Sequence, residues 1–295
     1  MFRFLKFLFS PVIAVLDFIT KYFKTIVFLT ILYFFVFDST DPLSEDTNSY
    51  ANLQKIELFG PILDVSKTLE QIEKAKNDFN IKGVLLDVNS PGGAVAPSVE
   101  LAYAIKELKE VKPVVVYASG VIASGSYYAS IWADKIIANP GSMVGSIGVI
   151  MQGVNVEELM KNIGVSTQTV KAGKYKEIGT PSRKWFDYEQ EYLQTVIDET
   201  YEMFITDVAT ARKLDVKNHT QFADAKIFNA LSAKKVGLID EVATLSTARR
   251  NLEELSKVKI PVWKKPDRFE KFIDKIISET VSQVSVYFSN GLKAY

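Results

Sequence analysis

The chain has 295 residues, enough for one large domain or two small ones, and carries 35 basic and 35 acidic side chains. A net charge of zero gives no broad basic field that would favour nucleic acid. The lack of cysteine excludes disulfides, thiolate nucleophiles and cysteine-built metal sites. The single histidine, His219, lies in a polar stretch typical of an exposed turn, and zinc motifs that need two histidines are excluded. We expect neither a metal nor another cofactor.

Residues 1–37 differ in kind from the rest of the chain. An apolar run from Ile26 to Phe37 follows four basic residues, Arg3, Lys6, Lys21 and Lys24. Because lysine side chains can snorkel to the membrane surface, residues 18–37 are long enough to span a bilayer. A cleaved signal peptide and a buried core helix are the alternatives, but no small-residue cleavage site follows Phe37. We expect a retained anchor region over residues 1–37 and a polar, acidic linker over residues 38–50.

The basic residues before the span also predict its orientation. Positive charge favours the cytoplasmic side, so we expect a single-pass protein of the cytoplasmic (inner) membrane with its N-terminus inside. Everything after the span, including any catalytic domain, is then extracytoplasmic.

Strands alternate with helices after the linker. Strands are predicted over residues 55–62, 83–88, 113–118, 135–139 and 143–151, and helices over 66–79 and 99–111, with a short helix after Ser124. This order is typical of an α/β domain whose strands are covered on both faces, which we expect over residues 51–250.

The later part of the chain is predicted to be mainly helical. A long amphipathic helix is expected over residues 188–213, and a second helix from Ile227 is expected to stop at Gly237. Residues 251–295 are expected to form a C-terminal amphipathic helical segment, with its apolar stripe starting at Phe269. Such a stripe usually packs on a core or a sister subunit, and membrane contact is the weaker alternative.

Three stretches rich in small residues follow predicted strands, where open α/β sheets place their sites: residues 89–95, 123–128 and 139–149. None of them combines the lysine and hydroxyl that hold a nucleotide, which argues against phosphate binding. The second stretch contains Ser124, followed directly by Gly125. A serine nucleophile needs a base for its proton and donors for the oxyanion that forms on the attacked carbonyl.

A lysine held neutral is the base that remains for such a serine. An ordinary lysine titrates near 10.4, and burial must lower this to roughly 7–8 before it can accept a proton. Lys171, Lys174 and Lys176 are candidates, and periodicity does not choose among them or exclude that all three are solvated. The paired glycines Gly92 and Gly93 and the N–H after the nucleophile could supply the oxyanion donors.

The motifs NSPGG, ASGSYY, ADKIIANPGSMVGSIGVI and AGKYKEIGTP follow one another in that order. The set resembles the bacterial signal peptide peptidases (SppA), membrane-anchored serine proteases, in their short form with one catalytic unit. The similarity extends from about Lys55 to Val242, where GLIDEVA matches the closing element of the family. The resemblance implies an α/β fold of the Clp protease/crotonase type, a repeated ββα superhelix, here with an N-terminal transmembrane helix.

The resemblance also assigns roles to individual residues. Ser124 matches the family nucleophile and Lys176 matches its general base. Ser146, in GSIG, matches the serine that orients the lysine, and the N–H groups of Gly93 and Gly125 match the oxyanion hole. The implied function is hydrolysis of peptide bonds in cleaved signal peptides and other short or unfolded chains. The implied assembly is a homo-oligomeric ring or dome, an octamer being one candidate, whose subunits share the Ser–Lys dyad.

Two departures from the family pattern stand out. Ser126 replaces a glycine common in the motif and is a second candidate nucleophile, and DAKIFNALSAKKVG lacks the usual glycines. Tyr127 and Tyr128 are expected to be core aromatic residues beneath the site. Two alternative functions are an acyl-thioester enzyme of the crotonase type, for which suitable glutamates are not evident, and a catalytically inactive scaffold in a membrane complex.

Overall fold

A computed structural model describes residues 17–30, 32–33 and 50–265. The chain divides into two units, and Ala51–Lys264, the larger one, is called the compact unit below. In the other unit residues 17–30 and 32–33 are helical, and the rings of Phe18 and Tyr22 lie 4.8 Å apart. No helix among the described residues combines the length and the apolar character needed to cross a membrane. Part of the predicted span, residues 31 and 34–37, lies outside the described residues, as does the apolar stripe of residues 269–284.

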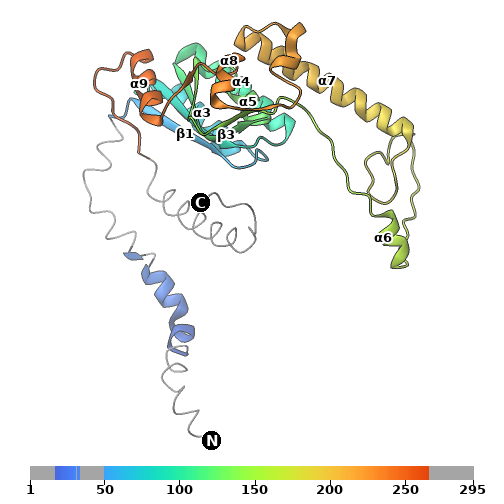
Figure 1. The fold of residues 1–295 in the computed structure, drawn as a ribbon. Coiled ribbons are helices and arrows are strands. Elements are labelled where there is room, and N and C mark those ends of the chain that lie inside the picture. Colours follow the sequence, from blue (N-terminus) through green and yellow to red (C-terminus); the bar gives the residue numbers. More distant parts are fainter. Residues whose placement is uncertain (1–16, 31, 34–49, 266–295) are drawn as a thin grey trace, which may run out of the picture. The chain divides into compact units, whose positions relative to one another are not determined.

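The compact unit is built on a seven-stranded sheet (Figure 1). Its main path is parallel, in the order β1 (Leu53–Phe59), β2 (Gly83–Ser90), β3 (Val114–Ala123), β4 (Lys135–Ala138) and β7 (Glu241–Val242). The first half of β3 pairs with β4, and its last three residues pair instead with β5 (Met143–Gly145). β5 is also antiparallel to β6 (Ile227–Asn229). This change of partner places β5 beside the carboxyl end of β3.

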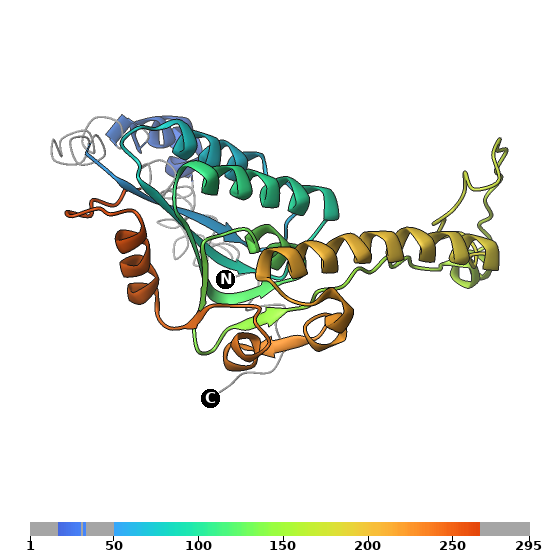
Figure 2. The same ribbon diagram turned by 90° about the horizontal axis from the view of Figure 1, so that it is seen from above.

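Helices cover both faces of the sheet, as the sequence predicts (Figure 2). The larger core lies between one face and α3 (Ser66–Asn77), α4 (Val95–Val111), α5 (Gly125–Ser130) and the second half of α7 (Asp187–Arg212). On the other face, α9 (Leu245–Leu255) covers a smaller cluster that includes Leu85 and Val115. The sequence of strand β2 accounts for helices on both faces of the sheet. Its side chains point alternately into the larger and the smaller core, so the strand is a continuous apolar run that is buried on both faces.

Three expectations about individual elements need correction. Residues 227–229 form strand β6 and not the start of a helix, because Phe228 pairs with Val144, and the Asn229 side chain then caps α8 (Ala230–Lys235) at 2.8 Å from the Ser232 N–H. The strand expected over residues 143–151 ends at Gly145. His219 lies in a short 3₁₀ helix (Val216–Gln221), half-buried with its ring 5.9 Å from that of Tyr201, and not in an exposed turn.

Helix α7 confirms the long helix predicted over residues 188–213, and it carries an arm. Its second half is anchored in the core by Phe204, Ile205, Val208 and Ala209. Its first half extends away from the body, and the segment between β5 and α7, with α6 (Glu157–Asn162), lies at its far end (Figure 2). We call residues 150–186 the arm. At 1.5 Å per residue, the 26 residues of α7 span about 39 Å.

The smaller core contains one polar group that predicts a pH-dependent stability. Asp87 is 6 % exposed, and its Oδ1 has no hydrogen-bond partner among the described residues. Burial raises the pKa of this carboxyl above its ordinary value. A carboxyl with a raised pKa binds its proton more tightly in the folded protein than in the unfolded chain. Its ionised form therefore lowers the free energy of unfolding at pH values above the folded pKa. This loss of stability disappears as the pH falls below the pKa in the unfolded chain, about 3.9.

We therefore expect Asp87→Asn to stabilise the protein by about 1 kcal/mol at pH 7 and by much less at pH 3. Thermal unfolding at the two pH values measures the effect. The exposed Glu254 on α9 provides the matched control, and Glu254→Gln should change the unfolding temperature little at either pH. A lower unfolding temperature for Asp87→Asn at pH 7 would contradict the expectation.

Candidate active site

Ser124 lies at the junction of β3 and α5, in a strained backbone conformation. Its φ is +52° and its ψ is −125°, a region that non-glycine residues rarely adopt. Its N–H donates to the Gly145 carbonyl at 2.8 Å, and its side chain is only half-buried. A sharp turn between a strand and a helix that exposes a serine hydroxyl is the arrangement found at nucleophile elbows.

Ser146 lies beside Ser124 in the same chain. Because Ala123 pairs with Gly145 in the parallel β3–β5 ladder, the next residues, Ser124 and Ser146, leave the sheet next to one another. Ser146 also has a positive φ, +50°, and its N–H donates to the Lys226 carbonyl at 2.7 Å. The structure therefore brings together two serines that the sequence separates by helix α5 and strands β4 and β5.

The backbone of Gly93 approaches Gly125 from the other side. Gly93 forms a parallel bridge with Ile62, in which the Ile62 N–H donates to the Gly92 carbonyl and the Ala94 N–H to the Ile62 carbonyl. Neither bond uses the N–H of Gly93, which lies 3.4 Å from the position that a Cβ on Gly125 would occupy. The N–H of Gly125 belongs to the first turn of α5, where backbone donors lack intrahelical acceptors.

Gly92 must be a glycine at this point. Its φ is +91°, and a Cβ there would lie 2.6 Å from the Gly125 nitrogen and 2.8 Å from the Ser124 Cβ. The two loops are therefore in direct backbone contact, and two N–H groups adjoin the serine, as an oxyanion hole requires.

A cavity of about 100 Å³ opens beside Ser124. Its walls come from the Gly93 loop, α4, α5, residues 148–150 and α7, and no charged side chain lines it. Most of its side chains are apolar or aromatic, namely Val95, Val99, Tyr128, Val149, Ile150, Met203 and Phe204. Such a cavity can accept an apolar side chain next to the serine.

Both tyrosines of the ASGSYY motif are core residues, as expected. Tyr127 donates its hydroxyl to the Leu238 carbonyl at 2.7 Å, and Tyr128 hydrogen-bonds Asp207 of α7 while its ring packs edge-on against Phe204 at 5.0 Å. Burial raises the pKa of both phenols above their ordinary value. Tyr128 also lines the cavity, and its bond to Asp207 ties the turn that holds Ser124 to the helix that carries the arm.

Ser126, the second candidate nucleophile, is fully buried, with 0 % exposure. Its hydroxyl lies 2.7 Å from the Ser90 carbonyl and 2.9 Å from the Ala123 N–H. A substrate carbonyl has no access to this oxygen. The geometry thus favours Ser124 over Ser126.

Lys176 is not brought to Ser124 within the chain. It is exposed in the arm, next to Tyr175, whose ring lies 4.8 Å from that of Tyr192 in the first half of α7. The cavity beside Ser124 is instead lined by Thr200, Met203 and Phe204, eight to twelve residues farther along α7. The rise of an α-helix puts these residues about 12–18 Å along α7 from Tyr192, and Lys176 does not line the cavity.

The three candidate lysines differ in their surroundings. Lys171 forms an ion pair with Glu177 at 2.9 Å, and the ammonium of Lys174 lies 4.2 Å from the centre of the Tyr188 ring. Lys176 has no ion pair with any residue of the described part of the chain.

A buried ion pair fixes the base of the arm to α7. Both guanidinium nitrogens of Arg183 lie 2.8 Å from the Glu189 carboxylate, which is 0 % exposed and also accepts the Phe186 N–H. The Arg183 hydrogen bonds lower the pKa of Glu189 to about 2. The pair therefore stays charged at any pH suitable for an assay and restrains the loop that contains Lys176.

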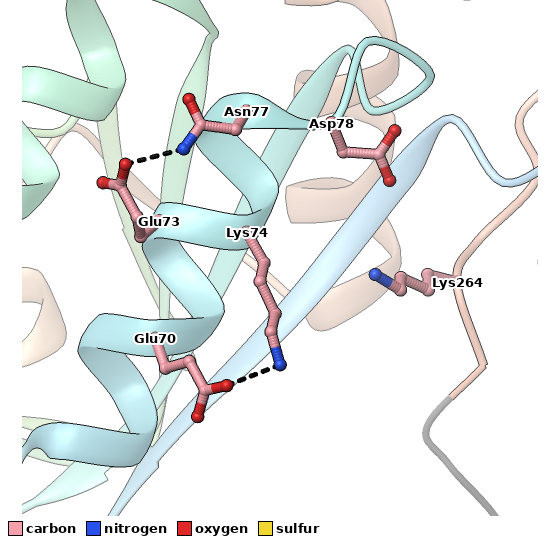
Figure 3. A pocket seen from close by; sticks show the side chains of 6 residues that line it. All are labelled: Glu70, Glu73, Lys74, Asn77, Asp78 and Lys264. Atoms are coloured by element: carbon pink, nitrogen blue, oxygen red, sulfur yellow. Dashed lines mark hydrogen bonds and ion pairs between the residues drawn. The ribbon is translucent and has the colours of Figure 1, made fainter.

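A second, larger hollow of about 500 Å³ lies over α3 and contains no such chemistry (Figure 3). Charged and amide side chains surround it and bond to one another, as Lys74 does with Glu70 at 2.6 Å and Asn77 with Glu73 at 2.6 Å. It has no nucleophilic hydroxyl and no apolar wall. Within the described residues, no cluster of three or more His, Asp or Glu side chains could hold a metal ion.

Several residues at the site carry no recognisable signal in the sequence. Thr200, Met203 and Phe204 enter the cavity from α7, about 80 residues after Ser124, and Asp207 bonds Tyr128 from the same helix. The apolar stripe of α7 predicts that this face is buried, but its partner depends on how α7 packs. Arg183 and Glu189 likewise read as ordinary surface charges until the arm folds against α7.

Comparison with known proteins agrees with the motif order. The model of peptidase family S49 matches residues 106–259, just over half of the chain. "Putative protease MJ0651" of Methanocaldococcus jannaschii is 49 % identical over 193 residues, 65 % of this chain and 61 % of that protein. "Putative signal peptide peptidase SppA" of Enterococcus faecium is 31 % identical over 233 residues, 74 % of this chain and 68 % of that protein.

Some relatives are considerably longer than the matched region. "Protease 4" of Salmonella typhi is 33 % identical over 193 residues, which cover 65 % of this chain but only 31 % of that protein. In all three comparisons the shared part includes most of the compact unit that holds the Ser124 turn and its cavity. The family model matches more than half of this chain, and the chain has a strained serine beside two backbone N–H donors. This chain therefore belongs to peptidase family S49.

Proposed function

We propose that this protein is a membrane-anchored serine endopeptidase in which Ser124 is the nucleophile and Lys176 of a neighbouring copy is the general base. The observation that carries the proposal is the position of Ser124, half-exposed on a strained turn, where it lines an uncharged cavity together with Gly93 and Gly125. Membership of family S49 supports peptide hydrolysis as the reaction.

Each residue then has a defined step. The neutral Lys176 amine takes the proton of Ser124 as the hydroxyl oxygen bonds to the peptide carbonyl carbon. The oxyanion that forms accepts hydrogen bonds from the N–H groups of Gly93 and Gly125. The charged lysine gives the proton to the leaving amine as the C–N bond breaks, which leaves an acyl-enzyme. The lysine then takes a proton from water, whose oxygen attacks the ester, and Ser124 regains its hydrogen.

Ser146 is proposed to orient the incoming lysine. Its place beside Ser124 puts a second hydroxyl where the amine must arrive, and its backbone is fixed by the bond to Lys226. A hydroxyl that accepts a hydrogen bond from the amine can direct the lone pair of the nitrogen toward the nucleophile.

The arm supports a dyad shared between copies. Within one chain, Lys176 does not line the cavity beside Ser124, and its neighbour Tyr175 packs on the first half of a long helix that projects beyond the body (Figure 2). The arm also exposes apolar side chains that a partner could cover, including Val154, Leu159, Ile163 and Val170. A closed ring of copies would let each arm reach the next body, because head-to-tail contacts close when the rotation permits.

The cavity supports apolar peptides as substrates. A charged side chain would lose its hydration in an uncharged pocket, whereas an apolar side chain gains by entering it. Remnants of cleaved signal peptides and other short or unfolded chains fit this preference. The β3–β5 branch of the sheet also supports the finer fold assignment, a Clp protease/crotonase-like superhelix.

Membrane anchoring rests on the sequence of residues 1–37. Its basic residues and apolar run support a single span in the cytoplasmic membrane, with the compact unit outside. Retention of the full-length chain in the membrane fraction after washing at high pH would support the span, and its release would contradict it.

The activity is tested with the full-length chain purified in detergent. Fluorogenic peptides that differ only in the residue before the scissile bond should be cleaved with different efficiency. We expect kcat/KM to be at least about tenfold higher when that residue is leucine or alanine than when it is aspartate or lysine. Matched acyl-thioester substrates should give no turnover. Absence of peptide cleavage, or turnover of the thioester, would contradict the proposed function.

A further inference from the structure

We propose that Ser126 is a positioning residue, whose buried hydroxyl holds the two loops of the oxyanion hole at their working separation. The inference rests on the proposed function, because it concerns the geometry of that hole. It concerns the residue at which this chain departs from the common motif.

The bonds of Ser126 connect the two loops directly. Its Oγ donates to the Ser90 carbonyl at 2.7 Å and accepts the Ala123 N–H at 2.9 Å. The Ala123 carbonyl, also 2.9 Å away, is an alternative acceptor for the same proton. Ser90 is the last residue of β2 before Pro91, Gly92 and Gly93, and Ala123 is the last residue of β3 before Ser124 and Gly125. One hydroxyl thus links the segments on which both proposed donors depend.

The sheet provides only part of this link. The β2–β3 ladder is regular as far as Val88 and Ala118, and its next and last pair is Ser90 with Ile122. Between these two pairs, Asn89 of β2 lies opposite residues 119–121 of β3, and this irregularity interrupts the ladder just before the two loops begin. The Ser126 side chain bonds across the strands where this irregularity leaves the ladder weakest.

A small movement of either loop would change the hole. A Cβ on Gly92 would lie 2.6 Å from the Gly125 nitrogen, so the loops touch without an intervening side chain. Oxyanion donors act at about 2.7–3.1 Å, and a displacement of a fraction of an ångström weakens them. The Gly92 N–H extends the network, because it donates to the Ser90 side chain at 3.2 Å.

Ser126→Ala is the direct test, with Ser130→Ala as its matched control. Ser130 is in the same helix and equally buried at 0 % exposure, and its hydroxyl bonds the Ser126 carbonyl at 2.8 Å, within α5. Both variants lose one buried hydroxyl, but only Ser126→Ala loses a bond between loops. We expect kcat to fall about tenfold in Ser126→Ala with KM changed less than about twofold, and kcat of Ser130→Ala to stay near wild type.

A peptide aldehyde provides a readout that loss of stability alone would not change. The Ser124 oxygen bonds to the aldehyde carbon, the former carbonyl oxygen takes the place of the oxyanion, and the proton ends on that adduct. The inhibition constant should rise by about the same factor as kcat falls in Ser126→Ala, because both depend on the same donors. Thermal unfolding measured in parallel reports the structural effect of each variant.

Ser126→Gly separates the hydroxyl from its volume. Glycine leaves space in which a water molecule can bridge the Ala123 N–H and the Ser90 carbonyl, whereas the alanine methyl group blocks it. We expect about a threefold loss of kcat for Ser126→Gly, between wild type and Ser126→Ala. This variant also decides the question alone if Ser126→Ala fails to fold.

The outcomes are distinct. Wild-type kcat and inhibition constant in both Ser126 variants would overturn the positioning role, as would equal losses in Ser126→Ala and Ser130→Ala. These results would leave the proposed function intact. Full activity in Ser124→Ala would instead overturn the proposed function, whatever the Ser126 variants show.

Discussion

Replacing Ser124 by alanine is expected to reduce peptide hydrolysis by at least about a thousandfold, with little change in KM or in thermal stability. The hydroxyl is the atom that attacks the carbonyl in the proposed reaction, and no other side chain in the cavity can replace it. The Thr200 hydroxyl bonds the Val196 carbonyl and the Ser98 hydroxyl bonds the Ala94 carbonyl, each at 2.8 Å. The Ser126 hydroxyl does not line the cavity and is buried. Lys176→Ala should cause a loss of similar order, because the serine then has no base.

The measurement is steady-state turnover of a fluorogenic peptide by the full-length chain. Ser142→Ala is a suitable control, since Ser142 is equally a serine near the end of a strand but is 1 % exposed and donates to the Ala118 carbonyl at 2.8 Å. It should keep kcat within a few fold of wild type. A Ser124→Ala protein with more than about a tenth of wild-type kcat would refute the role of this serine.

Mixing the two inactive variants is expected to restore activity. If each site combines Ser124 of one copy with Lys176 of the next, a mixed assembly contains some sites in which both residues are intact. In a random equal mixture, half of the bodies carry the serine and half of the neighbouring arms carry the lysine, so about a quarter of the wild-type activity should return. The arm geometry is the reason, because Lys176 does not line the cavity beside Ser124 in its own chain, and its neighbour Tyr175 packs against Tyr192, about 12 Å along α7 from Thr200.

Co-expression of Ser124→Ala with Lys176→Ala, followed by purification through a tag on only one of them, measures this recovery. A chain that carries both substitutions, co-expressed with the Ser124→Ala variant, is the control and should stay inactive, because no serine is intact. Failure to recover activity in demonstrably mixed assemblies would show that the sharing of the dyad is wrong. Activity in the double-substituted control would point to a contaminating peptidase.

The local sequence predicts most elements of the compact unit because its patterns are unambiguous. The continuous apolar run of residues 83–88 and the spacing of Leu69, Ile72 and Ala75 correspond to β2 and α3. The prediction is wrong for residues 227–229, where an isolated apolar pair before a helix has no period of its own. The partner strand β5 supplies the hydrogen bonds that make this segment a strand.

The residues of the candidate site are likewise only partly predictable from the sequence. The resemblance carried by the ordered motifs predicts Ser124, Gly93, Gly125 and Ser146. The structure places the first three in the wall of one cavity and Ser146 beside Ser124. Side chains from α7 complete the cavity, and no local pattern marks them. The choice between Ser124 and Ser126 also depends on burial, because both are serines in one short motif.

The sequence alone determined the α/β class and the turn that presents the serine, because periodicity and small residues act over a few neighbouring positions. It also excluded cysteine and paired-histidine chemistry, since that depends only on which residues are present. Only the tertiary structure decided that the Ser126 hydroxyl bonds the ends of both β2 and β3, and that the arm with Lys176 packs on the first half of α7, away from the cavity beside Ser124. Those facts depend on how distant segments pack, and packing is set by the whole core.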